Sequence, residues 1–282
     1  MKRIVAGLLT VGLLAACASP LAKPETPQQA VAAAANRANQ LHSAKFDLQG
    51  HVNLTFPPQL ASLFAQSGAT AGSFALDLTG NGEAQFPDRY HALINAKLGG
   101  VAIGSEVVSV AGTAYVKNPL TGKWTASSVP GGIAGQLNQP DPLSYAQLLK
   151  NVKSIKDLGD TTINGTAVHH YQLIPDKAKL LAGASTGSSS KDAQAQAALK
   201  QVLDNGNMTI EVWFGKADHL VRRLQTDADY TMDLGQLMSS LGSGSSSSSR
   251  VPTGSNIHAV AHMVINYHDF DSQLTITVPT VS

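Results

Sequence analysis

The fold is decided by residues 43–56, SAKFDLQGHVNLTF, in which apolar and polar side chains alternate. Even positions from Phe46 to Phe56 are apolar apart from Gly50, and odd positions from Lys45 to Thr55 are polar. Successive side chains of a strand point to opposite faces, so this period of two predicts a strand in a sheet with one apolar and one solvated face.

The same alternation recurs along the chain and predicts about ten strands. The dipeptides Ala111-Gly112 and Asn164-Gly165 predict hairpin turns, whereas residues 117–124 are expected to form a turn region. The further expected strands are residues 74–86, 90–98, 101–110, 113–117, 155–163, 167–174, 208–214, 219–230, 257–267 and 273–278.

Helix signals lie before and between these strands. Thr26, Pro27 and Gln29 match a capping box with proline at the first helical position. Further helices are expected from Asp141 to Val152 and over residues 192–204. The fold class is therefore α+β: a single curved antiparallel sheet with helices packed on its apolar face. The first helix would present small apolar residues, namely Val31, Ala34, Ala35, Ala38 and Leu41.

The N-terminal residues are typical of a lipoprotein signal. Lys2 and Arg3 precede an apolar run that is too short to span a membrane, and Leu14-Ala15-Ala16-Cys17 matches the bacterial lipobox. We expect residues 1–16 to be a signal peptide, residues 17–25 a tether lipidated at Cys17, and residues 26–282 one domain. The alternative is an ordinary signal peptide with an incidental cysteine.

The amino-acid composition argues against several classes of function. The chain has 20 Lys+Arg against 19 Asp+Glu and no basic block, so nucleic acid is not an expected partner. Cys17 is the single cysteine, which excludes an internal disulfide framework and a cysteine-rich metal site. A length of 282 residues allows one or two domains.

Catalytic and metal motifs are weak. Residues 183–187 match G-x-S-x-G around Ser185, but they open a serine-rich loop instead of following a buried strand. His258 and His262 would lie about 13 Å apart on one strand, too far to share a zinc ion. We expect them to be solvent-facing polar positions, and we expect no metal, no cofactor and no enzymatic activity. An esterase using Ser185 is a third hypothesis.

Two segments are expected to be flexible insertions, residues 184–190 and 231–256, because they contain serine- and glycine-rich stretches. Short apolar helical stripes lie at residues 60–64 and 234–241. They would either cap the core or form mobile lips of a lipid cavity.

Several motifs in order resemble a known family. They are Cys17 in its lipobox, Leu41-His42-Ser43-Ala44, Gly112-Thr113-Ala114-Tyr115-Val116 followed by Trp124, Asp141-Pro142, Ile163-Asn164-Gly165-Thr166, Val212-Trp213-Phe214 and residues 274–279. Together they resemble the LppX/LprA/LprF/LprG lipoproteins of mycobacteria and related bacteria. The resemblance implies a half-barrel similar to LolA and LolB, with helices enclosing a hydrophobic cavity for acyl chains of envelope lipids. The long segments near 184–190 and 231–256 depart from the family pattern.

The leading hypothesis is a membrane-anchored, extracytoplasmic protein that binds a lipid or glycolipid and carries or presents it, with an envelope lipid transporter as a possible partner. The alternative is a surface-tethered interaction or adhesion module with a filled core. The expected cavity wall consists of Phe46, Leu48, Val52, Leu54, Leu76, Leu78, Ile94, Leu148, Leu149, Ile210, Val212 and Met263.

Overall fold

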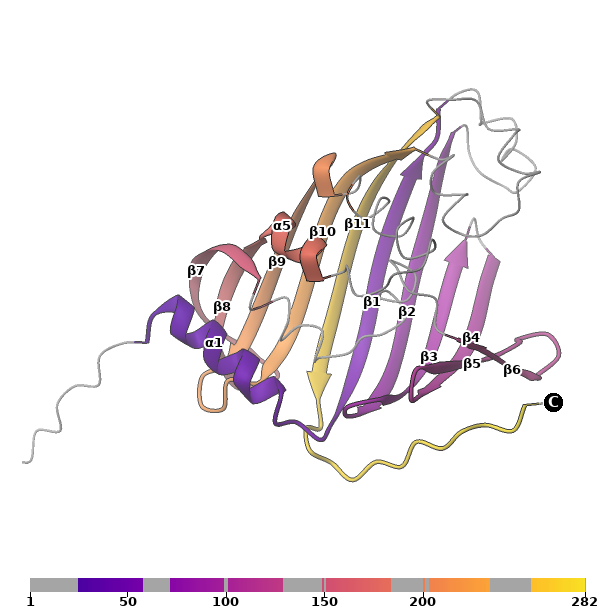
Figure 1. Ribbon diagram of the computed structural model, residues 1–282, viewed down its shortest axis with the longest axis horizontal. Coiled ribbons are helices and arrows are strands. Elements are labelled where there is room, and N and C mark those ends of the chain that lie inside the picture. The colour runs from indigo at the N-terminus through magenta and orange to yellow at the C-terminus, as the bar shows by residue number, and fades with distance from the viewer. Residues whose placement is uncertain are drawn as a thin grey trace, which may run out of the picture.

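Eleven strands form one antiparallel sheet (Figure 1). The computed structural model describes residues 25–57, 72–98, 101–128, 149, 151–183, 200, 203–233 and 255–281. The strands are β1 (Ser43–Thr55), β2 (Ser73–Gln85), β3 (Arg89–Leu98), β4 (Val101–Val110), β5 (Thr113–Lys117), β6 (Trp124–Ser128), β7 (Val152–Ile163), β8 (Thr166–Pro175), β9 (Gly206–Gly215), β10 (Val221–Asp233) and β11 (Asn256–His268). The predicted antiparallel sheet is confirmed.

The order β6-β5-β4-β3-β2-β1-β11-β10-β9-β8-β7 describes two meanders joined in the middle. β1 pairs with β2 on one side and with β11 on the other, so the first and last of the described strands lie side by side. In this register Phe46 lies opposite Tyr267 and Leu48 opposite Ile265. The pairing joins the N-terminal and C-terminal halves into one surface.

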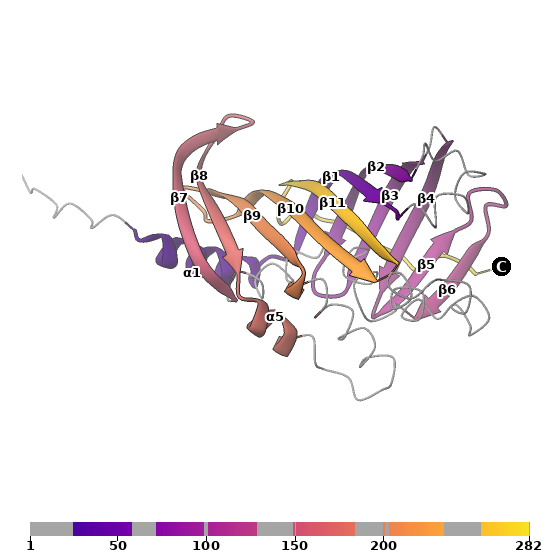
Figure 2. The same ribbon diagram turned by 90° about the horizontal axis from the view of Figure 1, so that it is seen from above.

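Helix α1 (Pro27–Ala38) begins with the predicted capping box. The Gln29 backbone N–H donates to the Thr26 hydroxyl at 3.3 Å, and the Thr26 backbone N–H donates to Gln29 Oε1 at 2.9 Å. Its small side chains, including Ala34 and Ala35, are buried in one core with Phe46 of the sheet. Figure 2 shows the sheet as an arch, with α1 and the short helix α5 (Lys177–Gly183) on its concave side.

A glycine on β2 makes room for a large core side chain of β1. Gly82 lies opposite Phe46. A Cβ at position 82 would lie 2.5 Å from Phe46 Cζ, well inside van der Waals contact. The Phe46 ring therefore lies over β2 where any larger residue would exclude it.

Both predicted hairpin turns are confirmed. Ala111 and Gly112 have φ values of 49° and 78°, and Asn164 and Gly165 have φ values of 48° and 79°. Two successive positive φ angles are the signature of a type I′ turn, whose twist matches that of the flanking strands.

The structure corrects four sequence-based predictions. Residues 273–278 form no strand: this segment runs past the strand ends in Figure 1, where no free strand edge lies alongside it, although Ile276 is buried. β6 was missed: it begins at Trp124, the last residue of the expected turn region, and its five residues are too short to show a clear alternation. Helix α5 was missed, although Asp176 Oδ1 accepts hydrogen bonds from the Ala178 and Lys179 N–H groups. Val152 begins β7 instead of ending a helix.

Asp271 fastens α1 and the start of β1 to the segment that follows β11. One carboxylate oxygen accepts a hydrogen bond from the His42 backbone N–H at 2.8 Å, and the other lies 3.2 Å from Arg37 Nη2 of α1. The His42 N–H, followed by the Arg37 guanidinium, lowers the pKa of the Asp271 carboxyl below its usual value. The ionised carboxylate thus stabilises the attachment of the helix.

We expect Asp271→Asn to lower the free energy of unfolding at pH 7, with the difference from the wild type shrinking on acidification. A carboxyl whose folded pKa is depressed contributes stability above its unfolded pKa of about 3.9 and loses it as pH falls through the folded pKa. Urea unfolding of both proteins between pH 7 and pH 3 measures this difference. A constant difference over the whole range would show that the charge of Asp271 has no such role.

Candidate functional site

The apolar face of the sheet has a packed zone next to α1. Phe46, Leu48, Ile210 and Val212 are buried and share one core with α1. Leu149, from a predicted helix, is helical and buried in the same core. The structure therefore brings together five of the twelve expected wall residues, and it places them where protein side chains already fill the space.

A second zone of the same face continues along the strands away from α1. Ala228, Ala261, Val52 and Leu76 lie in one register row across β10, β11, β1 and β2. All four side chains are half-buried, as are those of Leu54 and Leu78. We call this region the open zone. Ile94 and Met263 lie between the two zones, partly buried and packed against the core.

Exposure rises further toward β4. Val101 pairs with Leu98 and Ile103 pairs with Ala96, which places them on the same face as Leu76 and Leu78. Val101 is 62% exposed and Ile103 is 47% exposed. Apolar side chains on the concave face thus pass from buried under α1 to solvent-exposed at β4.

The dimensions of the elements explain this gradient. α1 has 12 residues, which gives a length of about 18 Å, whereas a 13-residue strand such as β1 is about 43 Å long. Eleven strands at about 4.8 Å spacing make the sheet about 48 Å wide. A helix about 10 Å across covers only a fraction of such a face.

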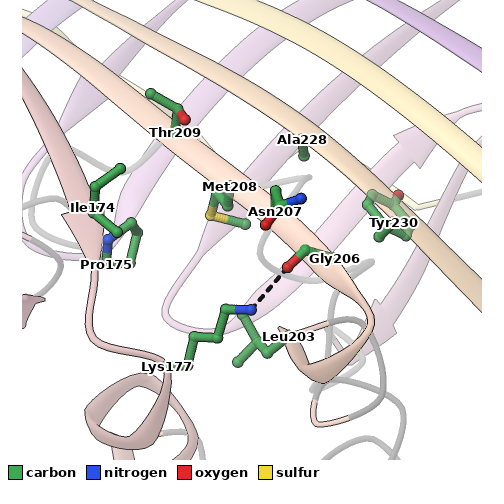
Figure 3. A pocket seen from close by; sticks show the side chains of 10 residues that line it. All are labelled: Ile174, Pro175, Lys177, Leu203, Gly206, Asn207, Met208, Thr209, Ala228 and Tyr230. Atoms are coloured by element: carbon green, nitrogen blue, oxygen red, sulfur yellow. Dashed lines mark hydrogen bonds between the residues drawn. The ribbon is translucent and has the colours of Figure 1, made fainter.

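A cavity of about 290 Å³ opens on the concave face near α5 (Figure 3). Its wall is mostly apolar, and Lys177 is the one lining residue with a charged side chain; its Nζ donates to the Gly206 carbonyl oxygen at 2.8 Å. Burial raises the pKa of Tyr230, so its phenol stays neutral. The lining residues are Ile174, Pro175, Lys177, Leu203, Gly206, Asn207, Met208, Thr209, Ala228 and Tyr230.

None of these ten lining residues was among the expected wall residues. Met208 was visible as part of an alternating segment, but Ala228 and Tyr230 become recognisable only through the pairing of β9 with β10. Leu148, Cys17, Ser185 and the apolar stripes at 60–64 and 234–241 lie outside the described residues.

The opposite face of the sheet is polar and rich in histidine–carboxylate pairs. Each of the nine histidines of the chain, including those outside this face, has a ring nitrogen within 4 Å of an Asp or Glu oxygen. His258 and His262 pair with Asp229 and Asp227, at 2.7 Å and 2.6 Å, and both side chains are about half exposed. The prediction that they are solvent-facing polar positions is confirmed.

Within the described ranges, no three His, Cys, Asp or Glu side chains lie together in a way that could hold a metal ion. No helix in that part of the chain combines the length and the apolar character needed to cross a bilayer.

Comparison with known proteins finds similar structures at low sequence identity. LprF from Mycobacterium bovis is 14% identical with a TM-score of 0.46, over 90% of this chain and 96% of that one. The Mycobacterium tuberculosis lipoprotein LppX is 13% identical with a TM-score of 0.43, over 89% and 98%. A LolA superfamily protein from Nitrosomonas europaea is 8% identical with a TM-score of 0.26, over 89% and 94%. No family model and no curated protein sequence matches the chain. LprF and LppX are two of the proteins that the sequence motifs resemble.

The two zones differ in how much stability a side chain contributes. We expect Leu48→Ala, in the packed zone, to lower the free energy of unfolding by about 2–5 kcal/mol through the void it leaves. Leu76→Ala, in the open zone, removes the same atoms from a half-buried position and should cost about 1 kcal/mol. Urea unfolding compares the two variants. Equal losses would show that both leucines belong to one filled core.

Proposed function

We propose that this chain is an envelope lipoprotein that binds acyl chains of a lipid or glycolipid on its concave apolar face and carries or presents them without covalent chemistry. The observation that carries the proposal is the open zone with its adjoining cavity. Large exposed apolar areas on soluble domains mark interaction or ligand sites. A concave and mostly apolar surface suits hydrocarbon chains better than a polar substrate.

Burial of hydrocarbon supplies the binding energy. Each buried CH₂ contributes about 0.8 kcal/mol, so a chain of about 16 carbons gains on the order of 10 kcal/mol before ordering costs. The row Ala228, Ala261, Val52 and Leu76 offers small and medium side chains along which such a chain can lie. The charge of Lys177 at the cavity lies close to a polar headgroup in this arrangement.

The packed zone is the observation that supports the alternative function, an interaction module with a filled core. Phe46, Leu48 and Ile210 form an ordinary buried core with α1, as a filled domain requires. Leu76, Ile94 and Met263 are only partly buried, and this favours a ligand on the remainder of the face. Lipid content of the purified protein distinguishes the two functions.

A tryptophan in the open zone tests the binding surface. We expect Ala228→Trp to reduce co-purifying lipid at least tenfold, because its ring fills part of the cavity that Ala228 lines. The matched control is Val260→Trp, on neighbouring β11 but on the polar face, where the side chain is 40% exposed. Both full chains are expressed in the same bacterial host, and bound lipid is extracted and quantified by mass spectrometry.

Thermal unfolding of the delipidated proteins checks that both variants fold. Loss of lipid in Ala228→Trp alone, with unfolding temperatures close to the wild type, agrees with the proposal. Equal lipid in both variants, or a wild type free of lipid from several hosts, would favour the interaction module.

We further propose that acyl groups on Cys17 anchor the protein at the extracytoplasmic face of the cell membrane. Cys17→Ala should abolish metabolic labelling with a palmitate analogue and leave an uncleaved or secreted form, because the cysteine is the acceptor of the acyl groups. Fractionation and labelling of cells expressing either protein measure this. Unchanged labelling of the variant would show that the lipobox was misidentified.

A further inference from the structure

A single positive charge lies at the cavity on the concave face. Lys177, the first residue of α5, is the one charged residue among those that line this cavity. Its side chain reaches to the first residue of β9, where Nζ donates to the Gly206 carbonyl oxygen at 2.8 Å (Figure 3). Leu203 and Pro175, which line the same cavity, are buried. The ammonium is therefore held in place beside apolar walls.

Lys177 makes no ion pair with any described residue. Asp176, which precedes it, accepts hydrogen bonds from two backbone N–H groups of α5 instead. Asp204, next to the lining residue Leu203, pairs with Lys200. Four other lysines each pair with a carboxylate, namely Lys45, Lys117, Lys200 and Lys216. The charge at the cavity thus differs from these in having no counterion from the described part of the chain.

The chemistry of a lysine ammonium favours an anionic partner at this place. An ammonium has three N–H donors, and the Gly206 carbonyl accepts one of them, which leaves two for a ligand. Lysine binds phosphate as a point charge, and the attraction between two charges is stronger beside apolar walls than in open water. A neutral headgroup would leave the positive charge unpaired, and a cationic headgroup would be repelled.

We propose that the lipid bound on the concave face carries a phosphate in its headgroup and that Lys177 binds this phosphate through its remaining N–H donors. The proposal rests on the proposed function, because the acyl chain has to lie on the apolar cavity wall for its headgroup to reach Lys177. Lys177 then acts as a specificity residue that selects among amphiphiles with the same hydrocarbon chain.

Lys179 provides a matched control. It lies two residues after Lys177 on the same short helix, is likewise exposed, and does not line the cavity. A phosphate attracted only by the positive charge of α5 in general would respond to both lysines equally.

The experiment is a calorimetric titration of the delipidated full chain with two probes that differ by one phosphate, lauroyl glycerol phosphate and lauroyl glycerol. We expect the wild type to bind lauroyl glycerol phosphate at least tenfold more tightly, because hydrogen bonds between charged groups are stronger than neutral ones. Lys177→Gln should abolish this preference without weakening the binding of lauroyl glycerol. Lys177→Arg, which retains the charge, and Lys179→Gln should both keep the preference, and added salt should reduce it.

Several results would overturn the proposal. Equal affinity of the wild type for both probes, or a preference that survives in Lys177→Gln, would refute the phosphate headgroup while lipid binding itself stands. An equal loss of preference in Lys179→Gln would show a general charge effect, and displacement of lauroyl glycerol phosphate by equimolar inorganic phosphate would show a site for the free anion. If neither probe binds the wild type, the proposed lipid function fails as well. Binding of lauroyl glycerol by each variant shows that the variant is folded.

Discussion

In the described part of the chain the longest helix, α1, is short compared with the large apolar sheet face, and the structure depends on this mismatch. The small side chains of α1 are buried in the same core as Phe46 and Leu48 of the sheet. α1 is about 18 Å long, so it leaves the far ends of strands more than twice that length beyond its reach. The open zone therefore follows from the lengths of the elements, and a hydrocarbon ligand would bury the apolar side chains that α1 does not.

The pairing of β1 with β11 determines which side chains are neighbours on both faces of the sheet. On the concave face it places Val52 beside Ala261 and completes the row of small side chains that leads to Ala228. On the polar face the same register places His51 beside His262. One long-range contact between the two ends of the domain thus creates the apolar row and the histidine pair together, on opposite sides of the same strands.

Local pattern made most of the fold predictable, and long-range register explains most of what was missed. The alternation in residues 43–56 and the dipeptide Asn164-Gly165 determine a strand and a turn without reference to distant residues. β6 is too short to carry a pattern, and residues 273–278 alternate but run past the ends of the strands (Figure 1). The cavity near Tyr230 and the pairing of His51 with His262 depend on which strands are neighbours, and the sequence of a single strand does not show this.

The most direct test of lipid binding on the open zone is photo-crosslinking of the full chain with a diazirine fatty acid, followed by peptide mapping. Crosslinks should fall on β1 and β2 around Val52 and Leu76 and on β10 around Ala228, and an excess of unlabelled fatty acid should remove them. Crosslinks confined to the polar face, or scattered over both faces and resistant to competition, would contradict lipid binding on the open zone.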